Sequence, residues 1–122
     1  MASNWQQRIG RWGEKAAEEY LIRQGCRIID RNVRTEYGEL DLVIRHGDEI
    51  AFVEVKTRTG AAFGLPEEAI TDNKRIHLVE AAQAYLQEHP GLGESWRVDV
   101  IAVQGKPGKG TPRVVWFENA VS

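Results

Sequence analysis

The sequence has little cysteine and no long apolar segment, and both absences restrict what the protein can be. Cys26 is the only cysteine among 122 residues, so the chain cannot form an internal disulfide and nothing indicates an oxidising compartment. No run of apolar residues is long enough to cross a bilayer. Residues 1–8 lack the apolar stretch of a signal peptide. We therefore expect a cytoplasmic protein that does not act in a membrane.

The chain also lacks a strong charge of either sign. It has 16 lysine and arginine residues against 18 aspartate and glutamate residues, for a formal net charge of −2. Proteins that coat nucleic acid without selectivity are usually basic, so this balance argues against such a role, although it leaves room for a local basic patch. The length and the ordinary composition are typical of one globular domain, which we expect to span residues 1–122.

The spacing of apolar residues predicts two helices and five strands. The helices are expected at residues 5–24 and 72–88, the second capped by Thr71. The strands are expected at residues 26–34, 38–44, 50–56, 96–103 and 113–117. Residues 57–65 have no periodicity and are expected to form a loop. The third strand, the second helix and the fourth strand would form a βαβ crossover with parallel strands. The predicted fold class is therefore a mixed α+β (α/β) sheet with helices packed on it.

Residues 38–56 carry the most informative pattern of the chain. Two apolar runs rich in β-branched residues flank Gly47 and Asp48, which predicts a β-hairpin. If these two residues are the centre of the turn, the numbers of paired residues sum to 95. Asp41 then lies opposite Glu54, and residues 39 and 56 also face each other. Because alternate residues of a strand share a face, all four side chains would point the same way.

Facing carboxylates weaken a hairpin, so Asp41 and Glu54 require an explanation. Like charges directly across a strand pair repel. A divalent cation between them would remove the repulsion, because Mg²⁺, Mn²⁺ and Ca²⁺ prefer oxygen ligands. Alternatively, both groups face water and Lys56 neutralises Glu54. The apolar run at residues 50–53 indicates a strand covered on both faces, where unpaired charge is costly. That context favours the cation.

Several segments together resemble a known family. They read GRWGE at residues 10–14, GELDLV at 38–43, FVEVKTR at 52–58 and WRVDVI at 96–101. With these segments the chain resembles the YraN-like family of uncharacterised bacterial proteins, up to about Val103. That family is similar to the restriction-endonuclease-like PD-(D/E)XK superfamily, and archaeal Holliday-junction resolvases are its nearest relatives in pattern. The resemblance implies a restriction-endonuclease-like αβββαβ core with one extra C-terminal strand.

The resemblance also implies a catalytic site. The superfamily pattern is an Asp, a spacer and (Asp/Glu)-x-Lys, often with a Glu from the first helix. It matches Asp41, Glu54-Val55-Lys56 and Glu14. This set implies an endonuclease that depends on one or two Mg²⁺ or Mn²⁺ ions. Asp41, Glu54 and the Val55 carbonyl would hold the metal, with Glu14 bound directly or through water. Lys56 would orient the attacking water or stabilise the charge of the transition state.

Nucleic acid, DNA in the first place, is the partner that the resemblance implies. Phosphate contacts would fall to Arg11, Arg58, Lys74 and Arg75. The last two stand where the family pattern has a Lys-Gln pair. Resolvase-like proteins act as dimers on two-fold symmetric substrates, so a homodimer is the expected form. Branched or damaged DNA in repair or recombination would be the substrate.

Two other functions stay open at this point. One is a non-catalytic nucleic-acid-binding module that keeps the fold. The other is a metal-stabilised adaptor, for which exposed Trp5, Trp12 and Trp116 could form an interaction surface. The complete carboxylate, carboxylate and lysine set favours the endonuclease, since a protein that has lost catalysis usually loses one of the three.

Overall fold

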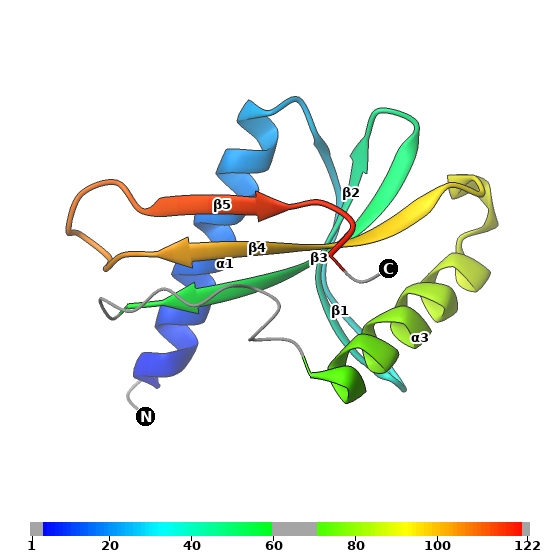
Figure 1. Ribbon diagram of the computed structural model, residues 1–122, viewed down its shortest axis with the longest axis horizontal. Helices are drawn as coiled ribbons and strands as arrows, with labels where there is room; N and C mark the ends of the chain where they lie inside the picture. Colours follow the sequence, from blue (N-terminus) through cyan, green and yellow to red (C-terminus); the bar gives the residue numbers. More distant parts are fainter. Residues whose placement is uncertain (1–3, 60–70, 121–122) are drawn as a thin grey trace.

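The computed structural model describes residues 4–59 and 71–120 of the chain (Figure 1). In chain order its elements are α1 (Trp5–Arg23), β1 (Arg27–Thr35), β2 (Gly38–His46), β3 (Glu49–Arg58), α3 (Asp72–Glu88), the 3₁₀ helix η1 (Pro90–Leu92), β4 (Trp96–Gln104) and β5 (Arg113–Phe117). Every predicted helix and strand is present, and their ends lie within two residues of the expected ones. β3 continues through Thr57 and Arg58, where a loop was predicted. Residues 60–65 of that predicted loop lie outside the described residues.

The described strands form one mixed sheet in the order β1-β2-β3-β4-β5. β3 and β4 are parallel, and the other neighbouring pairs are antiparallel. The predicted crossover through α3 and the predicted mixed α+β fold are therefore confirmed. The described helices do not have the length and apolar character that crossing a bilayer requires.

Local sequence signals explain where both helices begin. Asn4 caps α1, because its side chain accepts a hydrogen bond from the Gln6 N–H at 2.7 Å. Thr71 caps α3 as predicted, with its Oγ1 accepting from the Lys74 N–H at 3.2 Å. Gly25 follows α1 with a φ of 89°, a conformation that glycine adopts without steric cost and that commonly ends helices.

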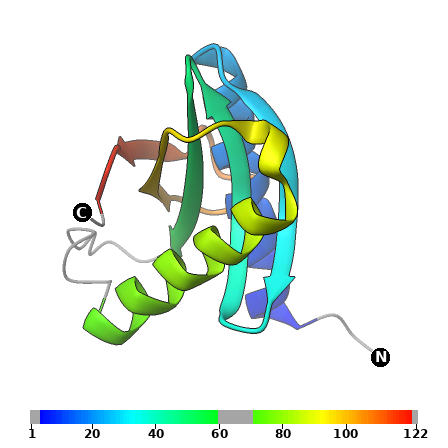
Figure 2. The same cartoon turned by 90° about the vertical axis from the view of Figure 1, so that its right-hand side faces the viewer.

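The helices cover opposite faces of the sheet, as Figures 1 and 2 show. Two separate cores result. The core beneath α1 consists of Ala17, Leu21, Cys26, Leu42, Ile44, Ala51, Val53, Ile101 and Val103. The core beneath α3 consists of Leu40, Val43, Ile50, Phe52, Leu78, Ala81, Ala82, Tyr85 and Val98. Because β3 contributes to both cores, its apolar run is nearly continuous, as expected for a strand buried on both faces.

The sheet opens between β2 and β3. Their ladder runs from the His46–Glu49 pair to the Leu42–Val53 pair, and the paired numbers sum to 95 as predicted. Beyond that point β2 stays paired with β1, and β3 stays paired with β4. In Figure 1, the paired β1 and β2 extend from this point toward the bottom of the view, whereas β3 and β4 extend toward its left. We call the space where β2 and β3 part, beyond Leu42 and Val53, the gap.

The prediction that Asp41 and Glu54 form a cross-strand pair is wrong, because the ladder ends one residue before them. The strict alternation of faces also fails at this point. Leu40 lies in the core beneath α3, whereas Leu42 lies in the core beneath α1. Asn32, which falls opposite Asp41 in the β1–β2 register, has a φ of 50°, which is uncommon for a residue other than glycine. A local twist of both strands thus removes Asp41 from the regular pleat.

Candidate active site

Asp41 is fixed across the gap by a backbone donor. Its Oδ2 accepts a hydrogen bond from the Val55 N–H at 2.8 Å. The side chain takes the place of a β2 backbone partner, because the two strands have already parted. The N–H and C=O of one strand residue point to the same side, so the Val55 carbonyl also faces the gap. Asp41 and the backbone of Val55 are therefore neighbours there, as the predicted metal site requires.

Glu54 is buried and held by two lysines. Its side chain is 10% exposed, and the Lys74 Nζ lies 2.6 Å from its Oε1. The Lys56 Nζ lies 3.4 Å from the same oxygen. A buried carboxylate needs such partners, because taking an unpaired charge out of water costs several kcal/mol. Lys56 comes from β3 and Lys74 from the first turn of α3, so ammonium groups from two elements meet at the Glu54 carboxylate.

Negative charge gathers around Asp41. Burial and then the carboxylate of Glu54 raise the pKa of Asp41 to about 7, with smaller contributions from Glu14 and Glu39 and an opposing one from the Val55 N–H. The pKa of Glu14 is also raised, first by burial and then by the charges of Glu39 and Glu54. Such shifts are typical of functional sites. Glu14 on α1 thus acts electrostatically on Asp41, while its role as a metal ligand stays a prediction.

The two lysines differ in how readily they lose a proton. Burial and then the neighbouring Lys74 lower the pKa of Lys56. Burial opposes ionisation of Lys74 as well, yet its hydrogen bond to Glu54 raises its pKa overall. Lysine is the cation whose pKa shifts most readily on burial. Lys56 is therefore the better of the two for exchanging a proton with a nearby water, and Lys74 is the better permanent charge.

The donor set fits a hydrated divalent ion. In the part of the chain that the structure describes, no three Asp, Glu, His or Cys side chains are placed to hold a metal ion among themselves. Mg²⁺ typically keeps several waters and binds through one or two carboxylates. Asp41, Glu54 and the Val55 carbonyl can supply such a set, and Glu14 could take part through water. These oxygens suit Mg²⁺ or Mn²⁺ rather than a metal that prefers nitrogen or sulfur.

The predicted phosphate-binding residues do not form one cluster. Lys74 pairs with Glu54. Arg75 is half-buried, and its Nε is enclosed without a hydrogen-bond partner among the described residues. Arg58 lines a cavity together with Lys56. Arg11 is exposed on α1, three residues before Glu14. The structure brings Lys74 and Lys56 to Glu54, and it places Arg58 in a cavity that Lys56 also lines.

The structure adds residues that the sequence did not suggest. Tyr37 and His77 line a cavity of about 180 Å³ that also includes Glu54 and Lys74. Tyr37 belongs to the turn between β1 and β2, and the residue is 39% exposed. No motif marks either residue, because the cavity exists only through the docking of α3 beside that turn. It lies on the α3 side of the gap.

A second polar cluster is structural. The Arg97 Nε donates to Asp99 at 3.0 Å, and the Trp116 Nε1 and the Asn119 N–H also donate to that carboxylate. Trp12 and Trp116 pack half-buried against the core beneath α1. The expectation that both are exposed with Trp5 is therefore wrong, since packing against the sheet buries much of their surface.

Comparisons with known proteins place the chain in a family. It is 46% identical over 112 residues to the UPF0102 protein of Pelotomaculum thermopropionicum, covering 92% of this chain and 93% of that protein. It is 51% identical over 96 residues to that of Syntrophotalea carbinolica, covering 79% and 78%. A solved structure of Pyrococcus furiosus SfsA in complex with Ca²⁺ has a TM-score of 0.41 and 16% identity, over 96% of this chain and 65% of that one. This last similarity is too low to assign a function.

The model of the family described as "Uncharacterised protein family UPF0102" matches residues 13–103. That range contains β1 to β3, α3, all of β4 but its last residue and most of α1, and with them the gap and its carboxylates. The chain therefore belongs to the UPF0102 family, which confirms the YraN-like resemblance of its sequence.

Proposed function

We propose that the protein is a divalent-metal-dependent endonuclease of the restriction-endonuclease-like superfamily, which hydrolyses phosphodiester bonds of DNA at the gap. One observation carries the proposal: Asp41, held by Val55, lies beside a buried Glu54 that two lysines contact. A chain selected only for stability would not keep carboxylates here, since burial and mutual repulsion disfavour their ionised forms. A bound cation offsets both costs.

Each residue of the site has a role that its surroundings support. Asp41 and Glu54 bind the metal, and the Val55 N–H holds Asp41 in place. Mg²⁺ or Mn²⁺, when bound, supplies a Lewis acid for the phosphate and a more acidic water. Lys56, whose pKa is lowered, orients the attacking water and exchanges a proton with it. Lys74 can exchange Glu54 for a phosphate oxygen and hold the scissile group.

The resemblance of the sequence to resolvases is the basis on which we propose a finer identity for the substrate. Similarity to archaeal Holliday-junction resolvases supports branched or damaged DNA as the substrate and a two-fold homodimer as the active form. Arg11, Arg58 and Arg75 are the remaining cations proposed for the phosphates. We propose residues 1–122 as one domain, because the described strands form one sheet whose two faces pack against α1 and α3.

One observation favours a second candidate, a nucleic-acid-binding module without catalysis. The Lys74 ammonium neutralises Glu54 at 2.6 Å, so the carboxylate already has a cation. In this alternative the lysines hold the site together and the arginines bind phosphate. The two candidates make opposite predictions for cleavage, whereas both predict binding that weakens with salt.

A cleavage assay separates them. Supercoiled plasmid and a synthetic four-way junction are incubated with the protein in Mg²⁺, in Mn²⁺ and in EDTA, alongside Asp41→Asn, Lys56→Ala and the exposed control Glu19→Gln. The endonuclease predicts metal-dependent cleavage that the first two variants lose by at least about 100-fold, as for removal of a general acid–base group. Cleavage that survives both variants would indicate contamination. Binding without any cleavage would support the second candidate.

A further inference from the structure

Trp5 is the most exposed large apolar side chain of the described residues. It lies at the start of α1, and 58% of its surface faces solvent. The Arg8 guanidinium lies over its ring, 5.7 Å from the ring centroid. The two other tryptophans of the α1 side, Trp12 and Trp116, pack against the core. Trp5 therefore combines a free aromatic surface with an adjacent cation, at a place where burial in the core does not explain it.

A cavity of about 470 Å³ adjoins Trp5. The first two turns of α1 form one wall and the end of β3 forms the other, and Figure 1 shows these segments side by side at the left of the view. This volume lies within the roughly 300–1,000 Å³ of small-ligand sites. Among the residues that the structure describes, its lining includes Lys56 and Arg58 and no carboxylate. The cavity thus suits an anionic ligand with an aromatic part.

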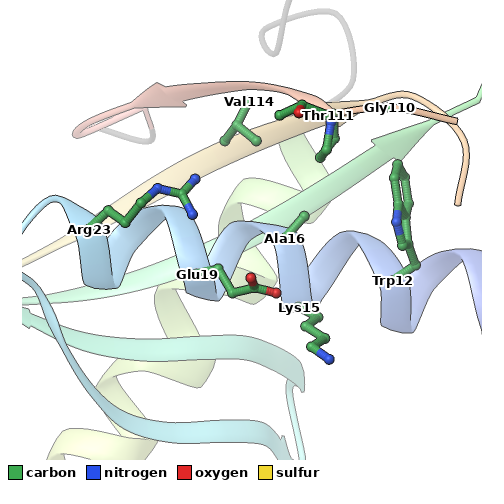
Figure 3. A pocket seen from close by; sticks show the side chains of 9 residues that line it. Trp12, Lys15, Ala16, Glu19, Arg23, Gly110, Thr111 and Val114 are labelled. Carbon is green, nitrogen blue, oxygen red and sulfur yellow. The ribbon is translucent and has the colours of Figure 1, made fainter. Parts of the chain in front are cut away.

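Two other cavities differ in charge. One of about 310 Å³ lies between α1 and β5, where Glu19 stands between Lys15 and Arg23 (Figure 3). The cavity of about 180 Å³ beside α3 contains Glu39 and Glu54. Both present carboxylates to a ligand, which would repel phosphate. Counting the described residues alone, the cavity at Trp5 is the one of these three that offers cations without an opposing charge.

Lys56 connects this cavity to the proposed catalytic site. It lines the cavity, and its ammonium also lies 3.4 Å from the Glu54 Oε1. Lys56 therefore borders both the cavity and the carboxylate of Glu54. Single-stranded nucleic acid is typically bound by a cationic groove together with aromatic rings that stack on the bases. In a duplex both faces of each base are already stacked, so such a ring cannot reach them.

We propose that Trp5 and its cavity bind an unpaired nucleotide of the substrate, with the base stacked on the indole and the flanking phosphates held by Arg8 and Arg58. The substrate is accordingly a single strand or a junction with an unpaired segment beside the cleaved bond. This proposal rests on the proposed endonuclease function for its substrate, but it concerns binding and is tested without catalysis.

The test compares affinities in EDTA, where a metal-dependent enzyme cannot cleave. Fluorescence anisotropy follows a labelled single-stranded oligonucleotide and the duplex made from it. The variants are Trp5→Ala, Trp5→Phe and the control Ile22→Ala, which alters another exposed residue of α1. Stacking on one base predicts that Trp5→Ala weakens single-strand binding about 5- to 150-fold. Trp5→Phe and Ile22→Ala should stay within about threefold of wild type, and duplex binding should be unchanged.

Arg58→Ala gives a second measurement that does not depend on Trp5. It should weaken single-strand binding. It should also reduce the slope of the logarithm of the affinity against the logarithm of the salt concentration by about one, as for the loss of one phosphate contact. The proposal is overturned if Trp5→Ala and Ile22→Ala have equal effects, if single strand and duplex lose affinity equally, or if wild type binds no single strand. In those cases a protein partner becomes the better occupant of the Trp5 surface. The two proposals can fail separately. If Trp5→Ala cleaves duplex DNA at the wild-type rate, the endonuclease function is retained whatever happens to single-strand binding. If single-strand binding depends on Trp5 but no cleavage occurs, only the endonuclease function is refuted.

Discussion

Replacing Asp41 with asparagine should stabilise the protein at alkaline pH in the absence of divalent ions. The carboxylate is buried beside Glu54, and both factors raise its pKa. Asparagine has nearly the same shape, and its side-chain oxygen can still accept the Val55 N–H. The substitution therefore removes a charge that the fold disfavours and keeps the hydrogen bond that positions the side chain. A residue that destabilises the fold in this way is expected where function requires it.

The size of the gain follows from the pKa. The rise from an ordinary 3.8 to about 7 corresponds to about 4 kcal/mol at about 1.4 kcal/mol per unit. Relaxation and water entry reduce that upper limit, so we expect about 1–3 kcal/mol. Because the pKa of Asp41 is higher in the folded than in the unfolded state, the native protein keeps this carboxyl protonated up to a higher pH. Wild-type stability is then unaffected below about pH 4, falls as the pH rises to about 7, and stays constant above.

Urea denaturation of wild type and Asp41→Asn in EDTA at pH 5 and pH 8 checks this prediction. The gain in stability of Asp41→Asn over wild type should be larger at pH 8, because at that pH the wild type bears more of the cost of ionising the buried Asp41. Asp48→Asn in the exposed turn of the hairpin is the matched control and should change stability by less than about 0.5 kcal/mol. A loss of stability in Asp41→Asn, or an equal gain at both pH values, would refute the reasoning.

Three further substitutions test the packing and the charges around the site. Gly13→Ala should destabilise the protein by about 1–3 kcal/mol in urea denaturation, because the new Cβ would clash with the Thr57 Oγ1. The double variant with Thr57→Ala should recover part of that stability. Unchanged stability of Gly13→Ala would contradict the close packing of α1 on β3. Lys74→Met should cost about 1–3 kcal/mol in EDTA, since Glu54 loses its nearer partner; unchanged stability would show that Lys56 suffices. Arg97→Met should cost about 3–5 kcal/mol of stability, because it leaves the fully buried Asp99 without its cation. The control Arg34→Met, at an exposed residue, should cost less than about 0.5 kcal/mol. Equal effects of the two variants would contradict a structural role for the Arg97–Asp99 pair.

Local signals were sufficient for most of the fold. Apolar periodicity, the Thr71 cap and Gly25 fixed both helices, and the Gly47-Asp48 turn set the register of β2 and β3. The extension of β3 through Arg58 was not predictable in the same way. Its polar residues continue as a strand because β4 offers parallel backbone partners as far as Gln104, and pairing of that kind depends on the whole sheet.

Part of the geometry of the candidate site was predictable from the sequence. The two-residue spacing of Glu54 and Lys56 placed both side chains together, and the ion pair confirms it. The opening of the sheet beside Asp41 depends on a twist shared with Asn32 of another strand. The contact between Lys74 and Glu54 depends on how α3 docks. Neither follows from a local pattern, since each joins residues far apart in the chain.

Direct measurement of Mn²⁺ binding tests whether Asp41 and Glu54 together hold a divalent ion at the gap. The protein at pH 8 is titrated while electron paramagnetic resonance follows the free ion. Wild type and the exposed control Glu19→Gln should bind one or two ions with the same affinity, and Asp41→Asn and Glu54→Gln should each lose at least about tenfold in affinity. Equal binding by all four proteins, or no binding by wild type, would contradict the metal site.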